Sequence, residues 1–454
     1  MQNGFTTWQI LSRNRSGYGI IGPMKIKVKD ASYEEVMAKK RPLPQKPVRQ
    51  STLLRTLMKT LSASELKKVH FTHTETDMED VRHTPCLVLM NHSSFIDLEI
   101  AATLLYPDPF HIICTSDGFV GKYKLMRDLG CIPTQKFVTD SRLVKDMLYA
   151  LKTLKSSVLM YPEASYSFDG CATPLPRSLG KCIKVLKVPV VMIHTYGAFA
   201  YDPLYNCLQK RNVDVSATMR CLLKPEETER MSADEINHVL AEAFRFDNFR
   251  WQQENHIRIE ESFRADGLNR VLYKCAACGT EGETEGKGTA IRCRHCGAEW
   301  ELTEEGALKK TADGNAQGSG RELTHIPDWY RWERECVREE LQNGTYRLDV
   351  PVDIIMMVDY EAVYRVGEGR LTHGREGFHL TGCDGKLDHE QSPLASYSLY
   401  ADYYWYELGD MICIGTKDVL YYCFPKTDRD IVAKTRLAAE ELYKLSKDVK
   451  SAFI

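Results

Sequence analysis

The chain has 454 residues, 43% of them hydrophobic, and a formal net charge of −2 at pH 7. This length predicts about three domains, and the apolar fraction is sufficient for packed cores. The near-zero charge argues against a nucleic-acid binder that works by bulk charge, and no apolar run reaches the roughly eighteen residues that a transmembrane helix needs.

The first residues differ in composition from the rest of the chain. Residues 1–23 are rich in Gly, Ser and Asn, and Met24 would make a natural start, so we expect a flexible tail or an upstream extension of the reading frame. Basic residues are frequent from Lys25 onward. We therefore assign residues 1–47 to a flexible basic N-terminal segment.

A basic amphipathic helix is predicted next. Five apolar residues fall on one helical face beside Arg55 and Lys59: Leu53, Leu54, Leu57, Met58 and Leu61. The helix could anchor the protein to a membrane surface. The slightly favoured alternative is a helix that packs on the sheet and leaves a solvated basic edge, because any packed helix shows a single row of leucines.

Residues 86–97, CLVLMNHSSFID, predict a buried strand that leads into a turn with His92 and Asp97. An imidazole can take a proton from a hydroxyl near neutral pH, and a carboxylate on its other nitrogen fixes the tautomer. Five residues cover about one and a half helical turns, so the two meet only if His92 lies just before a helix that contains Asp97. Alone, the pair fits a capping or core histidine equally well.

Residues 157–167 (SVLMYPEASYS) again predict an apolar strand that leads into a turn, which here carries Glu163. Residues 130–136 (GCIPTQK) lie between the two segments, and residues 188–193 (VPVVMI) follow them. With residues 86–97, their order and spacing resemble the four sequence blocks of the glycerolipid acyltransferase family, of the lysophosphatidate acyltransferase type. The first block of that family, NHxxxxD, is matched by Asn91, His92 and Asp97.

The resemblance implies an acyltransferase in which His92 is the general base and Asp97 orients it. The hydroxyl of a lipid acceptor, such as 1-acyl-glycerol-3-phosphate, would attack the thioester of an acyl-CoA or acyl carrier protein directly. The lack of a G-x-S-x-G nucleophile motif agrees with this. The resemblance also implies a group of substrate-binding residues: Asn91, Lys136, Glu163, Ser165 and Tyr166. Glu163 could instead tie down its turn by accepting bonds from backbone N–H groups.

The third block departs from the family pattern. The family usually has Gly-Thr-Arg after Pro-Glu, and its arginine is associated with the phosphate of the acceptor; here the residues are Ala164, Ser165 and Tyr166. Tyrosine cannot replace a guanidinium fork on a phosphate. Lys136 stands where an arginine is usual, and Met192 where proline is common. These changes leave a second hypothesis open, a non-catalytic protein that binds a lipid or an acyl carrier.

Strands alternate with helices around these blocks. Residues 111–115, 157–161 and 188–194 are predicted strands, and a helix is predicted to start at Asp140 or Ser141. This alternation predicts an α/β domain with a largely parallel sheet, whose site lies at the strand ends. We place it at residues 48–265, closed by a helical stretch at 232–263.

A small metal site is predicted at residues 266–310. Cys275, Cys278, Cys293 and Cys296 form two C-x-x-C pairs that resemble a zinc ribbon, with four ligands and hence a structural zinc. The loop between the pairs is acidic, which favours a protein partner or a spacing role over nucleic acid. The other cysteines of the fifteen show no disulfide framework, which favours a reducing cytoplasm.

The remaining residues predict a linker at 311–325 and a mainly antiparallel β domain at 326–454. Its helix at 327–342 is followed by strands near 350–358, 397–406 and 411–415, and by a final helix at 428–447. This order weakly resembles a pleckstrin-homology-like domain, which would imply a lipid-headgroup or protein-docking module. Together the segments predict a cytoplasmic protein that works peripherally at the inner membrane surface.

Overall fold

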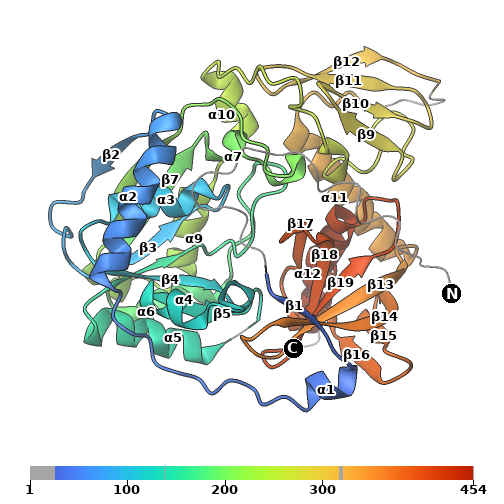
Figure 1. The fold of residues 1–454 in the computed structure, drawn as a ribbon. Helices are drawn as coiled ribbons and strands as arrows, with labels where there is room; N and C mark the ends of the chain where they lie inside the picture. The colour runs from blue at the N-terminus through green and yellow to red at the C-terminus, as the bar shows by residue number, and fades with distance from the viewer. Residues whose placement is uncertain (1–25, 139, 316–320, 453–454) are drawn as a thin grey trace.

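The computed structural model describes residues 26–138, 140–315 and 321–452 (Figure 1). The tail predicted at residues 1–23 lies outside this range. The described chain forms a seven-stranded sheet, a four-stranded sheet and an eight-stranded sheet. We call the three units the α/β domain, the ribbon and the C-terminal domain.

The seven-stranded sheet forms the centre of the α/β domain. Its strands, in spatial order, are β2 (Thr72–Thr76), β8 (Ser216–Leu223), β7 (Val190–Tyr196), β3 (Leu87–Met90), β6 (Ser157–Met160), β4 (Phe110–Thr115) and β5 (Cys131–Thr134). All neighbours are parallel except β7 and β8. The predicted α/β domain with a largely parallel sheet is therefore confirmed.

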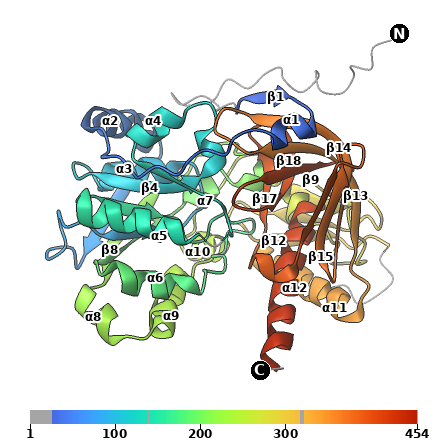
Figure 2. The ribbon, with the colours of Figure 1, turned by 90° about the horizontal axis from the view of Figure 1, so that it is seen from below.

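Helices cover both faces of this sheet (Figure 2). The helices α2 (Thr52–Lys68) and α3 (Ile96–Leu104) lie on one face, and α5 (Ser141–Leu148), α6 (Ser178–Leu186) and α9 (Ala233–Phe244) on the other. Strand β3 shows how the sequence separates the faces. Val88 and Met90 belong to the core under α2 and α3, while Leu87 and Leu89 belong to the opposite core.

Shorter helices complete the domain: α4 (Tyr123–Asp128), α7 (Ala198–Tyr201), α8 (Pro225–Arg230) and α10 (Asn248–Glu254). The helical stretch predicted at 232–263 is thus two helices. It breaks because α9 ends at Arg245 in extended conformation and Asp247 caps α10 through the amide of Arg250.

The ribbon is an antiparallel sheet of β9 (Thr284–Lys287), β10 (Ala290–Cys293), β11 (Glu299–Leu302) and β12 (Leu308–Ala312). Strand β12 extends into the predicted linker because its pairing with β11 continues to Ala312. Trp300 of β11 packs edge-on against Trp329, with 4.8 Å between ring centroids. Trp329 lies on α11 (Ile326–Asn343), so the ribbon shares a core with the C-terminal domain.

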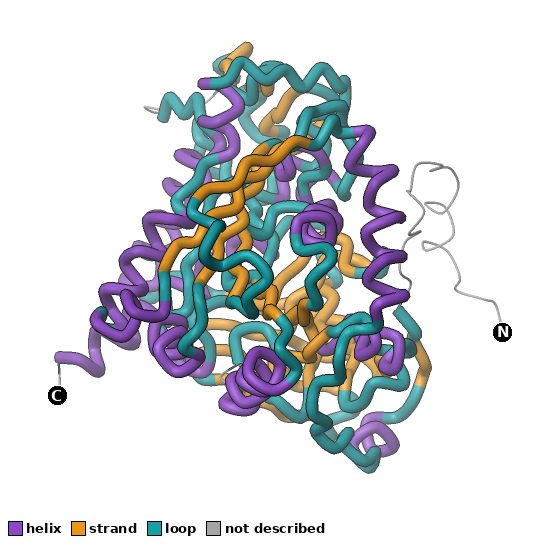
Figure 3. Tube along the Cα trace, turned by 90° about the vertical axis from the view of Figure 1, so that its left-hand side faces the viewer, coloured by secondary structure: helices purple, strands orange, loops and turns teal. Residues whose placement is uncertain are grey.

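The C-terminal domain is an antiparallel sheet followed by a helix, as predicted. Its strands are β13 (Leu348–Met357), β14 (Val363–Gly374), β15 (Gly377–Gly382), β16 (Leu387–Gln391), β17 (Tyr400–Trp405), β18 (Gly409–Gly415) and β19 (Leu420–Pro425), in the order β16-β15-β14-β13-β19-β18-β17. The last helix, α12 (Val432–Ala452), packs on α11 and β17, and its end projects from the body (Figures 2 and 3). The resemblance to a pleckstrin-homology-like domain stays a prediction.

Residues 26–47, the described part of the stretch 1–47 that was expected to be flexible, contain regular structure. Strand β1 (Val28–Asp30) pairs in parallel with β14, and α1 (Tyr33–Met37) begins at a capping box. The chain then runs alongside both domains to α2 (Figure 1). The Gln50 side chain fixes its end by donating to the carbonyl of Leu129 and accepting from the amide of Phe110. The pairing of β1 with β14 and the bonds of Gln50 therefore fix a segment whose composition alone predicted flexibility.

Candidate active site

The site begins where β3 ends. The Asn91 side chain is 6% exposed, accepts bonds from the amide and hydroxyl of Thr195 on β7, and donates to the Thr195 carbonyl. These bonds tie the turn after β3 to the neighbouring strand. Asn91 was predicted to bind substrate, but its amide group is committed to the protein behind the cavity wall. Its placement is that of a positioning residue.

His92 and Asp97 meet in the manner predicted. The Nδ1 atom of His92 lies 3.2 Å from Oδ2 of Asp97, which is fully buried in the first turn of α3. The same oxygen accepts from the amides of Ser93 and Ser94 at 2.8 and 3.0 Å. A carboxylate at Nδ1 favours the tautomer with the proton on that nitrogen. The Nε2 nitrogen of His92 is then free to accept a proton.

The imidazole of His92 lies between two tyrosine rings. Its centroid is 4.2 Å from that of Tyr161 and 4.1 Å from that of Tyr166, both stacked. Burial lowers the pKa of His92, an effect that Asp97 opposes and Lys136 reinforces. The ring is therefore held neutral at pH 7 and fixed in orientation, as a general base requires.

The Glu163 carboxylate accepts bonds from backbone N–H groups, as the second of its two predicted roles requires. One carboxylate oxygen accepts the amide of His92 at 2.9 Å, and the other accepts the amide of Thr173 at 2.7 Å. Burial raises the pKa of Glu163 to about 7 despite these bonds. Glu163 thus joins the turn that carries His92 to the third-block loop. Its bond to the backbone N–H of His92 helps to fix the position of that residue.

The remaining predicted substrate residues differ in placement. Lys136 and Tyr166 line a cavity of about 1290 Å³ together with His92. The Lys136 ammonium lies 4.1 Å from the ring centroid of Tyr400, and burial lowers its pKa. Ser165 is 2% exposed and donates to the Tyr166 carbonyl, so it belongs to the loop rather than to the cavity surface.

Sequence reasoning missed the residues that reach this site from the C-terminal domain. Arg436 of α12 donates to the Ser165 hydroxyl and the Tyr166 carbonyl, both at 3.4 Å, and pairs with Glu440 at 3.2 Å. Burial alone would raise the pKa of Glu440, but the charges of Arg334 and Arg436 lower it to about 2. Asp402 of β17 lines the cavity itself. No local motif marks either position. By contrast Tyr161, two residues before Glu163, could have been found from its place at the end of a strand.

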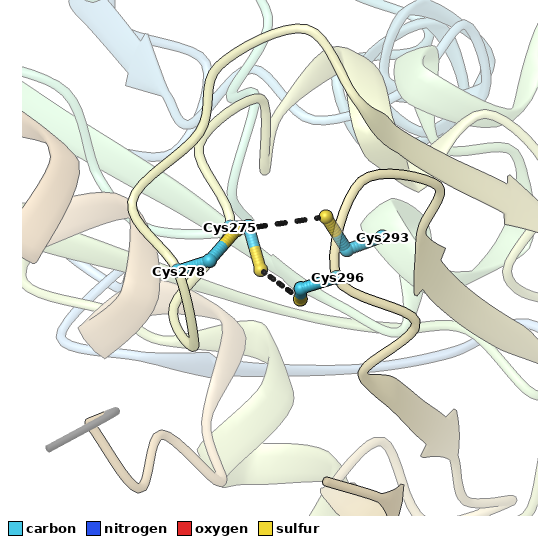
Figure 4. Close-up of side chains that lie close together, drawn as sticks. All are labelled: Cys275, Cys278, Cys293 and Cys296. Atoms are coloured by element: carbon cyan, nitrogen blue, oxygen red, sulfur yellow. Dashed lines mark hydrogen bonds between the residues drawn. The ribbon is translucent and has the colours of Figure 1, made fainter. Parts of the chain in front are cut away.

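The four cysteines of the ribbon come together (Figure 4). Their sulfur atoms all lie within 4.8 Å of one another, and the pairs Cys275–Cys296 and Cys278–Cys293 are each 3.8 Å apart. Sulfurs placed tetrahedrally at 2.3 Å from zinc would be about 3.8 Å apart. Gly279 and Gly297 each have positive φ where the two C-x-x-C turns close. The cluster could hold a metal such as zinc, with no position left for substrate.

Comparisons with known proteins place this site within one matched region. Residues 72–194, a range that includes His92, Asp97 and Glu163, match the sequence model of the Acyltransferase family. No curated protein matches the chain. Among solved structures, the chain is similar to the 1-acyl-sn-glycerophosphate (LPA) acyltransferase PlsC from Thermotoga maritima, with 14% identity over 46% of this chain and 82% of that one and a TM-score of 0.36. That likeness is too distant to support a statement about this chain.

Proposed function

We propose that this protein is an O-acyltransferase that moves a fatty acyl group from a thioester to a hydroxyl of a lipid acceptor. The observation that carries the proposal is His92, whose Nδ1 is held by Asp97 and whose ring faces a cavity of about 1290 Å³. Ligand pockets usually measure about 300–1,000 Å³, so the cavity has room for an acyl chain and a head group. The match of residues 72–194 to the Acyltransferase family supports the same chemistry.

The proposed reaction needs no covalent enzyme intermediate. Nε2 of His92 takes the proton of the acceptor hydroxyl while its oxygen attacks the thioester carbonyl carbon. The tetrahedral intermediate collapses by breaking the carbon–sulfur bond, and the leaving thiolate takes the proton back from the imidazolium. The products are an ester and a free thiol, as coenzyme A or as the carrier protein. Asp97 stabilises the imidazolium between the two transfers.

Thiol release by the purified chain tests the proposal. Acyl-CoA and acyl carrier protein are each offered with a panel of lysolipids and monoacylglycerols, and the acylated product is identified by mass spectrometry. We expect turnover that falls about a hundred- to ten-thousandfold in His92→Gln. The control is His83→Gln, which changes an exposed histidine on the same domain. Saturable lipid or carrier binding without turnover in the wild type would instead favour the non-catalytic hypothesis.

We further propose that α2 and α3 meet a membrane surface. No helix of the described residues is long and apolar enough to cross a membrane. Leu53 and Leu57 on α2 are 78% and 48% exposed, and Phe95, the residue directly before α3, is 56% exposed. Phe95 also lines the cavity, so an acceptor could pass from lipid to the site. Basic residues lie on α2 beside these apolar side chains, which suits an anionic bilayer.

Vesicle co-sedimentation tests this contact. The double variant Leu53→Glu and Leu57→Glu should lose binding to vesicles that contain phosphatidylglycerol. The control is Val185→Glu on α6, an apolar position that is 53% exposed and lies on the opposite side of the sheet. Equal binding by both variants would refute the assignment of this face.

The ribbon is proposed to hold one structural zinc ion. It packs against α11 through Trp300 and against α10, where Gln252 donates to the carbonyl of Glu304 at 2.8 Å. These contacts support a spacing role between the two larger domains. They leave a protein partner for its outer strands open as a prediction.

A further inference from the structure

The C-terminal domain is fixed against the proposed active site by direct hydrogen bonds. The hydroxyl of Tyr400 and the indole N–H of Trp405 donate to the same oxygen of Asp117, at 2.6 and 3.3 Å. Asp117 lies in the 3₁₀ turn after β4 (Ser116–Phe119), at the carboxyl end of the parallel sheet. Strand β17 is therefore part of the cavity wall and not a separate module on a linker.

The conformation of β17 is irregular where it borders the cavity. Its pairing with β18 shifts register between Asp402 and Trp405, and Tyr404 and Tyr406 have positive φ values of 61° and 45°. Non-glycine residues adopt this conformation at an energetic cost, and bulges change the direction of side chains. Among the described residues of this sheet, those that line the cavity lie on β17 and in the turn that follows it. Such strain is expected at a binding surface.

Two opposite charges face this part of the cavity without a direct contact. Asp402 and Lys136 both line it, and the charge of Asp402 acts on Lys136 and on Tyr166, which stacks on His92. Within the described residues, neither side chain has an ion pair, and no side chain donates a hydrogen bond to the Asp402 carboxylate. Burial raises the pKa of Asp402 to about 7, an effect that the charge of Lys136 and the backbone N–H of Tyr403 oppose. In its ionised form the carboxylate can accept a hydrogen bond from a ligand in the cavity that His92 also lines.

The cations that act on Asp402 and Lys136 are held by protein groups, whereas Arg177 and Lys181 line the cavity at the start of α6. Arg436 is held behind the wall by Glu440, Ser165 and the Tyr166 carbonyl. Lys68 and Lys210, which line another part of the cavity, both pair with Glu65. Lys136 lies over the Tyr400 ring and within the field of Asp402. A phosphate dianion next to Asp402 would meet the compensated ammonium group of Lys136 and a carboxylate.

From this arrangement we infer that Asp402 is a specificity residue, which binds a hydrogen-bond donor of the acceptor and disfavours acceptors that carry a phosphate monoester. The inference rests on the proposed acyl transfer and deepens it. The acceptor class is a lipid whose head group presents a hydroxyl or an ammonium group near the reacting hydroxyl. A monoacylglycerol supplies the first donor and lysophosphatidylethanolamine the second. Both lack the dianionic phosphate of 1-acyl-glycerol-3-phosphate.

The test compares kcat/KM for these three acceptors in the wild type, Asp402→Asn and Asp418→Asn. Asp418 is an exposed carboxylate in the turn before β19 and is the matched control. We expect the wild type to favour one of the two donor head groups over 1-acyl-glycerol-3-phosphate by at least about tenfold, as is typical for one good or bad charged contact. Asp402→Asn should narrow that ratio by about tenfold, and Asp418→Asn should preserve it. A wild type that prefers the phosphate monoester, or an unchanged ratio in Asp402→Asn, would overturn the inference.

A failure of the proposed function gives a different result. If no acceptor is acylated, the equilibrium dissociation constants of the same three lipids are measured for the wild type and both variants. Weaker binding of the phosphate monoester, relieved only in Asp402→Asn, would keep Asp402 as a specificity residue of a binding protein. Equal constants for all three lipids would reject that role as well. Thermal unfolding of each variant shows whether the fold is retained.

Discussion

The α/β domain and the C-terminal domain face the same cavity but contribute to it in different ways. The α/β domain supplies His92 and Asp97, which are five residues apart and meet because a strand, a turn and a helix follow one another. The C-terminal domain supplies Asp402 and Arg436, which lie more than 230 residues further along the chain than Glu163 and reach the site only through domain packing. The proposed catalytic pair is thus formed by residues that are close in the sequence, whereas part of the cavity around it is formed by residues that are far away in the sequence.

The largest expected effect is loss of the metal ion that we propose the ribbon binds. Structural zinc in small domains contributes about 10–16 kcal/mol of binding free energy. Cys275→Ser combined with Cys278→Ser should therefore unfold the ribbon and release one metal ion per chain. Metal analysis and protease sensitivity at residues 266–312 measure this. Cys336→Ser, on α11 and outside the cluster, is the control. Unchanged metal content in the double variant would contradict the ribbon site.

The next largest effect is expected in the α/β domain, where Asp97 holds His92. Asp97→Asn retains an oxygen that can accept the amides of Ser93 and Ser94 but no longer stabilises an imidazolium. The rate should fall about a hundred- to ten-thousandfold with little change in thermal stability. Asp108→Asn makes the same change in the partner of an exposed histidine, His83, whose Nδ1 lies 2.8 Å from Oδ2 of Asp108, and should leave the rate unchanged. If Asp97→Asn kept full activity, the dyad would not act as proposed.

A smaller effect is expected for Arg436, which the C-terminal domain contributes to the site. Arg436→Met leaves the buried Glu440 with one cation fewer and frees the loop that carries Tyr166. Breaking a buried pair typically lowers the free energy of unfolding by about 3–5 kcal/mol. Arg365→Met removes an exposed pair with Asp30 and should cost less than about 1 kcal/mol. Denaturant unfolding compares the two variants, and equal losses would show that α12 does not stabilise the site loop.

The smallest effect concerns pH. Burial lowers the pKa of His92 below its ordinary value, and only the neutral imidazole can take a proton. The value of kcat/KM should therefore rise with pH in the acid range and level off before pH 7. The midpoint should lie below the ordinary histidine value of about 6.5. A midpoint above that value would mean that the charge of Asp97 outweighs burial.

The sequence predicted those features that depend on near neighbours. Three such features are the apolar runs that form β3, β6 and β7, the spacing of His92 and Asp97, and the two C-x-x-C pairs. Each depends on residues that are close together in the sequence, and the structure brings these groups together as expected. The pairing of β1 with β14 and the placement of Asp402 could not be predicted in this way. They depend on which surfaces dock, and residue spacing does not specify docking. Asn91 shows a related limit. Its position in the motif predicted that it binds substrate, but in the structure its side chain is hydrogen-bonded to Thr195, which is distant in the sequence.

The central claim is that one domain supplies the base and the other selects the acceptor. Steady-state kinetics of His92→Gln and Asp402→Asn, with kcat and acceptor KM determined separately, tests it most directly. The account predicts that His92→Gln lowers kcat by at least about a hundredfold for every acceptor, and that Asp402→Asn changes the preference among acceptors while retaining turnover. Equal changes in both variants for all acceptors, or full activity in His92→Gln, would contradict it.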